Sequence, residues 1–280
     1  MVTPDSLTSF GDMVTRRVYG PLLAIGGAED KWRDRIILRR FVELSGGDDA
    51  RIAVIPTASR IPDAGEQYRK IFGELGVDNV DVMNIQTRAD ADDPAVLETL
   101  DQASGIFMTG GNQVRLARIL GRSAAVDVIQ RRNRSGVPVA GTSAGASVMS
   151  TVMVAGGQSG PTPRQRMAKL SRGLGLIDSV IIDQHFTERN RVSRLVTMVS
   201  YNPGLLGVGI DEDTAALISP EGYIEVIGRG SVLIVDGSRM ETDIEHVNGT
   251  TPPTISNALI HFVAEGGRYS LDERNVVPQD

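Results

Sequence analysis

Short apolar runs alternate with segments of helical periodicity along the first half of the chain. The apolar runs end in residues typical of turns and cover residues 21–27, 51–59, 80–86, 105–111 and 138–141. The helical segments cover residues 32–44, 65–75, a short stretch from Pro94, 114–120 and 124–133. Near-continuous apolar strands that alternate with helices are typical of a parallel sheet covered on both faces. The pattern therefore predicts an α/β fold, in which ligands bind at the carboxyl ends of the strands.

The second half of the chain has a different pattern. Residues 156–166 are rich in Gly, Pro and polar side chains and predict a long loop. Residues 180–186 form another apolar strand, which is followed by a helix to about Ser200. From Gly204 onward, short alternating runs and the turn at residues 220–223 predict antiparallel hairpins that extend the sheet. Residues 255–264 are expected to form a last helix.

Neither a repeat nor a domain-scale linker interrupts the 280 residues. A chain of this length can build one large α/β domain around a substantial core. We therefore expect a single domain. Its core covers about residues 21–237, with an N-terminal extension over residues 1–20 and a C-terminal region over residues 238–280.

Composition and charge exclude several classes of protein. The chain is 41% hydrophobic and 23% charged, which is typical of a globular protein. Its net charge of −6 argues against a general nucleic-acid binder. The absence of cysteine excludes disulfides, thiolate zinc sites and a cysteine nucleophile. Because no apolar segment is long enough for a signal peptide or a membrane span, we expect a cytoplasmic protein without a membrane partner.

One serine stands between two glycines directly after an apolar strand. In VAGTSAGASVM, residues 139–149, Ser143 lies between Gly141 and Gly145. A nucleophilic serine at a strained strand-to-helix turn has this pattern, and so does a small residue in a tight bend. A nucleophilic serine needs a base, and the base needs an orienting group. The rest of the chain must therefore supply both.

Only three histidines are available as the base. His246 lies in a charged, turn-rich segment and is expected to be solvated. His261 lies among apolar residues and is expected to have a structural role. His185 ends the apolar strand at residues 180–186, so it lies at a strand's carboxyl end, as Ser143 does. We therefore take His185 as the candidate base.

The orienting carboxylate is expected in GVGIDEDTA, residues 207–215, where another apolar run ends in acids. Asp211, Glu212 and Asp213 all qualify by position, and spacing favours none of them. Acids that satisfy the backbone of their own turn would give the same pattern. In α/β-hydrolases with a Gly-x-Ser-x-Gly turn the histidine follows the acid, whereas here it precedes it. The order of the residues therefore disfavours a lipase or esterase.

Four motifs in this order, GIFMTGGNQ, AGTSAGA, DQHFTERNRVSRL and GIDEDTA, resemble those of the cyanophycinases, which are serine exopeptidases of the peptidase S51 family. The resemblance covers roughly residues 22–236. It implies a single catalytic α/β domain with a largely parallel sheet flanked by helices, like that of class I glutamine amidotransferases or flavodoxin. It also implies a cytoplasmic homodimer without a cofactor or metal. The implied substrate is cyanophycin, a polyaspartate with an arginine on each β-carboxyl, and the implied products are β-Asp-Arg dipeptides released through an acyl-enzyme.

Carried over residue by residue, the resemblance makes Ser143 the nucleophile, His185 the general base and Glu212 the triad acid. It thereby selects one of the three acids that spacing left open. The backbone N–H groups of Gly111 and Ala144 are assigned to the oxyanion hole, and the residue after a nucleophile commonly supplies one such group. The implied substrate-binding residues are Gln113, Asp183, Gln184, Arg189, Arg191 and Arg194.

The three arginines differ in position. Arg191 and Arg194 can share a helix face at i and i+3, whereas Arg189 either precedes the helix or belongs to a solvated surface. Guanidinium groups pair with carboxylates through two hydrogen bonds, so this cluster would bind a substrate carboxylate. The alternative is an ordinary charged helix face. The motif departs from the family at Asn112, where aspartate is common, but asparagine keeps the turn preference.

Two other functions fit the same motifs. An α-aspartyl dipeptidase of the same family would cleave soluble Asp-X dipeptides instead of the polymer. A non-catalytic binding protein on the same fold is the second alternative, and it is disfavoured because every triad position is filled.

Overall fold

Nine strands form the main sheet of the computed structural model, which describes residues 19–249 and 251–278. The predicted N-terminal extension, residues 1–20, lies almost entirely outside these residues. The strands are β1 (Leu22–Ile25), β2 (Arg51–Ile55), β3 (Asn79–Val82), β4 (Gly105–Met108), β5 (Val139–Thr142), β10 (Thr214–Ile218), β11 (Tyr223–Gly228), β16 (Arg268–Ser270) and β17 (Asn275–Val277). They are ordered β17-β16-β11-β10-β1-β5-β4-β2-β3. The first five in the chain run parallel, which confirms the predicted parallel sheet.

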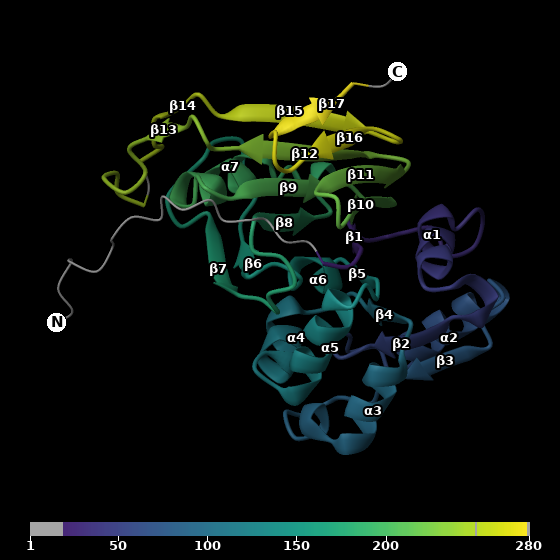
Figure 1. Cartoon of the computed structure of the whole chain (residues 1–280). Helices are drawn as coiled ribbons and strands as arrows, with labels where there is room; N and C mark the ends of the chain where they lie inside the picture. Colours follow the sequence, from purple (N-terminus) through teal and green to yellow (C-terminus); the bar gives the residue numbers. More distant parts are fainter. Residues whose placement is uncertain (1–18, 250, 279–280) are drawn as a thin grey trace.

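Helices cover both faces of the parallel strands (Figure 1). In the described residues they are α1 (Ile36–Leu44), α2 (Ala64–Glu74), α3 (Pro94–Gln102), α4 (Gln113–Leu120), α5 (Ala124–Arg134), α6 (Ala144–Ser147) and α7 (Val192–Tyr201), with short 3-10 turns at Gly47–Asp49, Asp90–Asp92 and Thr187–Arg189. Helices α1 and α2 bury their apolar sides on one face, and α3 to α6 on the other. No helix among the described residues is both long enough and apolar enough to cross a membrane.

Helix α1 begins four residues later than its apolar pattern predicts. The Asp30 carboxylate accepts the backbone N–H groups of Trp32, Arg33 and Arg35, which holds this segment in a turn. These hydrogen bonds hold the pKa of Asp30 well below its usual range. The helix therefore starts only at Ile36, after Arg35 in the left-handed conformation.

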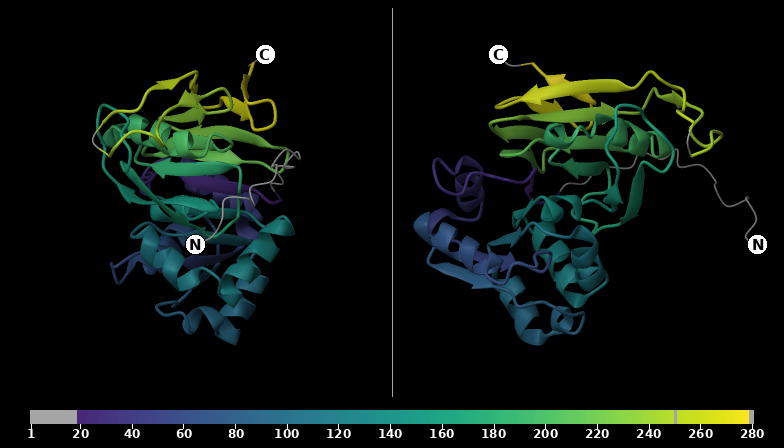
Figure 2. Two further views of the ribbon diagram at one scale, coloured as in Figure 1. Left: turned by 90° about the vertical axis from the view of Figure 1, so that its left-hand side faces the viewer. Right: turned by 180° about the vertical axis from the view of Figure 1, so that it is seen from behind.

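A second sheet lies beside the first and holds β8 (Val180–Gln184), β9 (Leu206–Ile210), β12 (Ser231–Asp236) and β15 (Leu259–Ala264). Figure 2 shows this sheet on the opposite side of the molecule from α3. Its strand β8 pairs in parallel with β9, and α7 packs on it. The hairpins β6 (Val152–Gly157) with β7 (Ala168–Arg172) and β13 (Glu241–Thr242) with β14 (Ile255–Ser256) complete the fold.

The predicted helix at residues 255–264 is wrong, because this segment forms β14 and β15. Along β15 the burial alternates: Ile260 and Phe262 are exposed, whereas His261 is partly buried and Val263 is buried. A period of two is the pattern of a strand and not of a helix. The strand is stabilised by antiparallel pairing with β12, which is too distant in sequence for a local pattern to reveal. The predicted hairpin at residues 220–223 is confirmed and joins β10 to β11.

Candidate active site

The turn that carries Ser143 is built by its two flanking glycines. A Cβ atom at Gly141 would lie 2.4 Å from the backbone of Gly145, and one at Gly145 would lie 2.3 Å from the carbonyl oxygen of Met108. Ser143 itself has φ 51° and ψ −107°, a conformation that L-residues rarely adopt. Its N–H donates to the Ile25 carbonyl of the neighbouring strand β1. The backbone of the turn is therefore strained, and it is held by close packing at the two glycines and by the hydrogen bond to β1.

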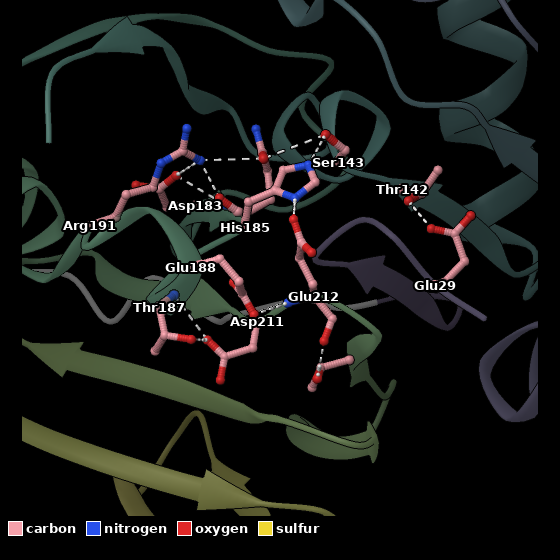
Figure 3. A network of polar contacts seen from close by, with 12 residues as sticks. Glu29, Thr142, Ser143, Asp183, His185, Thr187, Glu188, Arg191, Asp211 and Glu212 are labelled. Atoms are coloured by element: carbon pink, nitrogen blue, oxygen red, sulfur yellow. Dashed lines mark hydrogen bonds and ion pairs between the residues drawn. The ribbon is translucent and has the colours of Figure 1, made fainter.

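Ser143, His185 and Glu212 form one line of hydrogen bonds (Figure 3). The Ser143 Oγ atom lies 3.0 Å from Nε2 of His185. The Nδ1 atom of the same ring lies 2.5 Å from Oε1 of Glu212. These three residues come from the ends of β5, β8 and β9, which belong to two different sheets. The geometry is that of a nucleophile, a base and a group that orients the base.

The three neighbouring acids have different surroundings. Glu212 contacts the imidazole, whereas Asp211 is buried and accepts hydrogen bonds from Thr187 and Ser231. Asp213 accepts the Asp30 backbone N–H at 2.7 Å, and its other oxygen lies near an arginine of the β11–β12 turn. The carboxylates of Asp211 and Asp213 therefore stabilise neighbouring loops through hydrogen bonds. Of the three acids, only Glu212 contacts His185.

A pair of glycines at the end of β1 brings the two sheets together, and sequence reasoning missed it. The His185 N–H donates to the Gly26 carbonyl at 2.8 Å, and the Asp213 N–H donates to the Gly27 carbonyl at 2.9 Å. Gly27 has φ 102°, and a Cβ atom there would lie 2.4 Å from Cε1 of His185. The imidazole packs directly on this backbone, so a side chain at Gly27 would displace it. In the sequence, the Gly26-Gly27 pair directly after an apolar run was the pattern that could have indicated this close contact.

A buried carboxylate beside the nucleophile was also missed. Glu29 is 3% exposed, and its Oε2 atom accepts a hydrogen bond of 2.6 Å from the Thr142 hydroxyl (Figure 3). Its Oε1 atom accepts from the Tyr68 hydroxyl and lies 3.0 Å from the Lys31 ammonium. Burial, reinforced by the Glu29 charge, raises the pKa of Tyr68 well above its usual value. This network fixes the residue that immediately precedes Ser143.

The two oxyanion-hole candidates lie at turns that suit the role. Ala144 is the first residue of α6, where backbone N–H groups lack partners within the helix. Gly111 has φ 142°, and a Cβ atom there would lie 2.1 Å from the Ala58 carbonyl oxygen. The Asn112 side chain accepts the Arg115 N–H at 2.8 Å and so begins α4. Asparagine therefore serves as the helix cap at the position where the motif departs from the family.

Four of the six predicted substrate-binding residues form a cluster around the buried carboxylate of Asp183. Asp183 is fully buried and accepts two hydrogen bonds from Arg194, one of them from Nε at 2.8 Å. Arg191 donates from Nη1 to Asp183 at 3.2 Å and also to Gln184. Burial lowers the pKa of Arg191 to about 10, against the opposing effect of the Asp183 charge, so the group stays protonated at neutral pH. The Gln184 Oε1 atom lies 3.5 Å from the Ser143 hydroxyl.

The remaining two predicted residues lie apart from that cluster. Arg189 is exposed in the 3-10 turn before α7, as expected for a residue that precedes the helix. Gln113 begins α4 and donates to the Val154 carbonyl of β6 at 3.1 Å. Of the other histidines, His246 is exposed in a turn, and His261 packs edge-on against Tyr269. Among the described residues, no group of three or more histidines or acids is placed to hold a metal ion.

The chain belongs to peptidase family S51, whose model matches residues 22–226, and it is therefore a hydrolase of the peptidase class. It is 44% identical to the cyanophycinases of Trichormus variabilis and of a Nostoc species over 92% of its length and 87% of theirs. A cyanophycinase of Geminocystis herdmanii is also 44% identical, over 89% of this chain and 93% of that protein. The crystal structure of a peptidase from an acI-B1 actinobacterium has a TM-score of 0.64 and 23% identity, covering 91% and 98% of the two chains, and supports the fold.

Proposed function

We propose that this peptidase hydrolyses the polyaspartate backbone of cyanophycin and releases β-Asp-Arg dipeptides. The hydrogen-bonded line of Ser143, His185 and Glu212 carries the proposal, since it supplies a nucleophile, a base and an orienting acid in a chain 44% identical to cyanophycinases. The predicted homodimer and cytoplasmic location stay predictions.

In the proposed mechanism Ser143 attacks an aspartyl carbonyl while His185 takes the hydroxyl proton. The backbone N–H groups of Gly111 and Ala144 hold the oxyanion, and one such donor is worth about 10²–10³ in rate. His185 then gives the proton to the leaving amine, which leaves the acyl group on Ser143. Water, activated by the same histidine, hydrolyses this ester. Glu212 holds the ring and stabilises the imidazolium in both steps.

The contacts around Asp183 support different roles for the three arginines. Arg194 is 3% exposed and is occupied by the Asp183 carboxylate, so its role is to neutralise that buried charge. Arg191 lies 8% exposed between Asp183 and Gln184, which hold it in place, and Arg189 is exposed. We assign the substrate carboxylate to Arg191 together with Arg189.

An assay of the purified protein on insoluble cyanophycin, with the products identified by mass, tests this function. β-Asp-Arg as the product supports it. Soluble α-aspartyl dipeptides cleaved in place of the polymer would support the dipeptidase alternative. If the protein shows neither activity, the remaining interpretation is a non-catalytic binding protein on the same fold.

The rate of cleavage is expected to fall as the pH is lowered, because a protonated imidazole cannot accept the serine proton. A pH–rate profile of the parent measures this. His185→Ala should be inactive at every pH, whereas His246→Ala and His261→Ala should keep the parent's profile. A flat profile would contradict the role of His185.

Neutralising the arginines is expected to give two different results. Arg191→Gln should lower kcat/KM for the polymer about ten- to a hundredfold, because a charge-assisted hydrogen bond is worth roughly 1.5–3 kcal/mol. Acylation by a small activated ester, which lacks the carboxylate, should change little. Arg194→Gln should instead lower the free energy of unfolding by about 3–5 kcal/mol, because it leaves the buried Asp183 without its main partner. Thermal unfolding separates the two variants, and equal effects on polymer and ester would contradict the assignment of Arg191.

A further inference from the structure

The loop between β6 and β7 forms a partly open cavity of about 430 Å³ that the catalytic residues do not line. Gly157 at the end of β6 and Met167 just before β7 form part of its wall, and Gly249 contributes from a distant segment. The cavity is therefore a feature of this hairpin and of the segment packed against it.

The charged side chains that line the cavity are all positive. They are Arg164, Arg166 and Lys169, and among the described residues no carboxylate is part of the lining. Within the described residues none of the three cations forms an ion pair. Exposed cations that line a concave surface favour an anionic ligand, and guanidinium groups favour a carboxylate or phosphate.

The loop is held in place by two hydrogen bonds within the hairpin and one to the segment between β13 and β14. The Gln158 N–H donates to the Met167 carbonyl at 2.8 Å, and the Met167 N–H donates to the Arg164 carbonyl at 3.2 Å. The Gln165 side chain donates to the Ile244 carbonyl at 3.1 Å. These contacts define the shape of the cavity in the structure.

Strand β6 connects the cavity with the candidate active site. The Val154 carbonyl accepts the Gln113 side chain, and Gly157 follows three residues later, which corresponds to about 10 Å along a strand. A Cβ atom at Gly157 would lie 3.3 Å from Cδ of Arg194. The cavity thus adjoins the arginine cluster of the candidate active site.

We propose that this cavity binds the arginyl carboxylate of a polymer unit that neighbours the unit being cleaved. The proposal rests on the proposed function, because cyanophycin carries one such carboxylate on every unit. The guanidinium of that unit is repelled by the three cations and so points out of the cavity. The cavity is then a second binding position, which longer substrates use and a single unit does not.

The test measures binding to the Ser143→Ala protein, which retains the substrate. The probes are synthetic oligomers of one and of three β-Asp-Arg units. Arg166→Gln/Lys169→Gln in this background is expected to weaken binding of the three-unit oligomer about tenfold, as for the loss of a charge-assisted hydrogen bond. Binding of the single unit should not change. The matched control is Arg172→Gln, which removes an exposed charge from the same strand outside the cavity.

Two results overturn the proposal while the proposed function stands. One is cleavage of cyanophycin by the parent together with unchanged binding of the three-unit oligomer by the double variant. The other is an equal loss with Arg172→Gln, which would indicate a general effect of surface charge. A parent that neither cleaves cyanophycin nor binds its oligomers would instead overturn both.

Discussion

Ser143→Ala is expected to abolish cleavage of cyanophycin, with a loss in kcat of at least about 10⁴-fold. The Ser143 hydroxyl is the group within 3.0 Å of the His185 ring, so its removal leaves the base without a nucleophile to activate. Alanine keeps the Cβ atom and adds no clash at the turn. The measurement is the rate of dipeptide release, with thermal unfolding to show that the variant is folded.

The strained backbone supplies a second variant that separates chemistry from folding. Ser143 has a positive φ, which glycine adopts at little cost. Ser143→Gly should therefore be as inactive as Ser143→Ala but unfold at the same or a higher temperature than the parent. Near-native activity in either variant would contradict the role of Ser143 as the nucleophile.

Features that depend on local patterns could be predicted from the sequence. The strand before Ser143 is a continuous apolar run, and the glycines on either side of the serine mark the turn. His185 was the histidine at a strand end, and the structure places it against Ser143. The choice of Glu212 over Asp211 and Asp213 came from the resemblance, because three consecutive acids have no distinguishing local pattern.

Features that depend on contacts between distant segments could not be predicted. Ser143 and His185 both follow strand ends, but β8 lies in a second sheet. The end of β1 joins the two, because the Ser143 N–H donates to the Ile25 carbonyl and the His185 N–H to the Gly26 carbonyl. The burial of Glu29 depends on Thr142, 113 residues away. The strand at residues 259–264 depends on its pairing with β12. In each case the partner is defined by topology and not by the neighbouring sequence.

Glu212→Gln is expected to lower kcat by about a thousandfold or more, while the protein stays folded. The carboxylate 2.5 Å from Nδ1 of His185 fixes the tautomer in which Nε2 can accept the serine proton. A glutamine amide has the same shape but no charge to stabilise the imidazolium, and the equivalent change in the serine-protease triad costs about 10⁴-fold. The rate of dipeptide release and the melting temperature are the two measurements.

The neighbouring acids provide the matched controls. Asp213→Asn should keep nearly full activity, because asparagine can still accept the Asp30 N–H and tolerates the positive φ at this position. Asp211→Asn should lower the melting temperature, because the buried Asp211 carboxylate accepts hydrogen bonds from Thr187 and Ser231, but the folded fraction should keep its activity. If Asp213→Asn lost activity as severely as Glu212→Gln, charge at this strand end and not contact with His185 would control the rate. A fully active Glu212→Gln would remove the carboxylate from the mechanism.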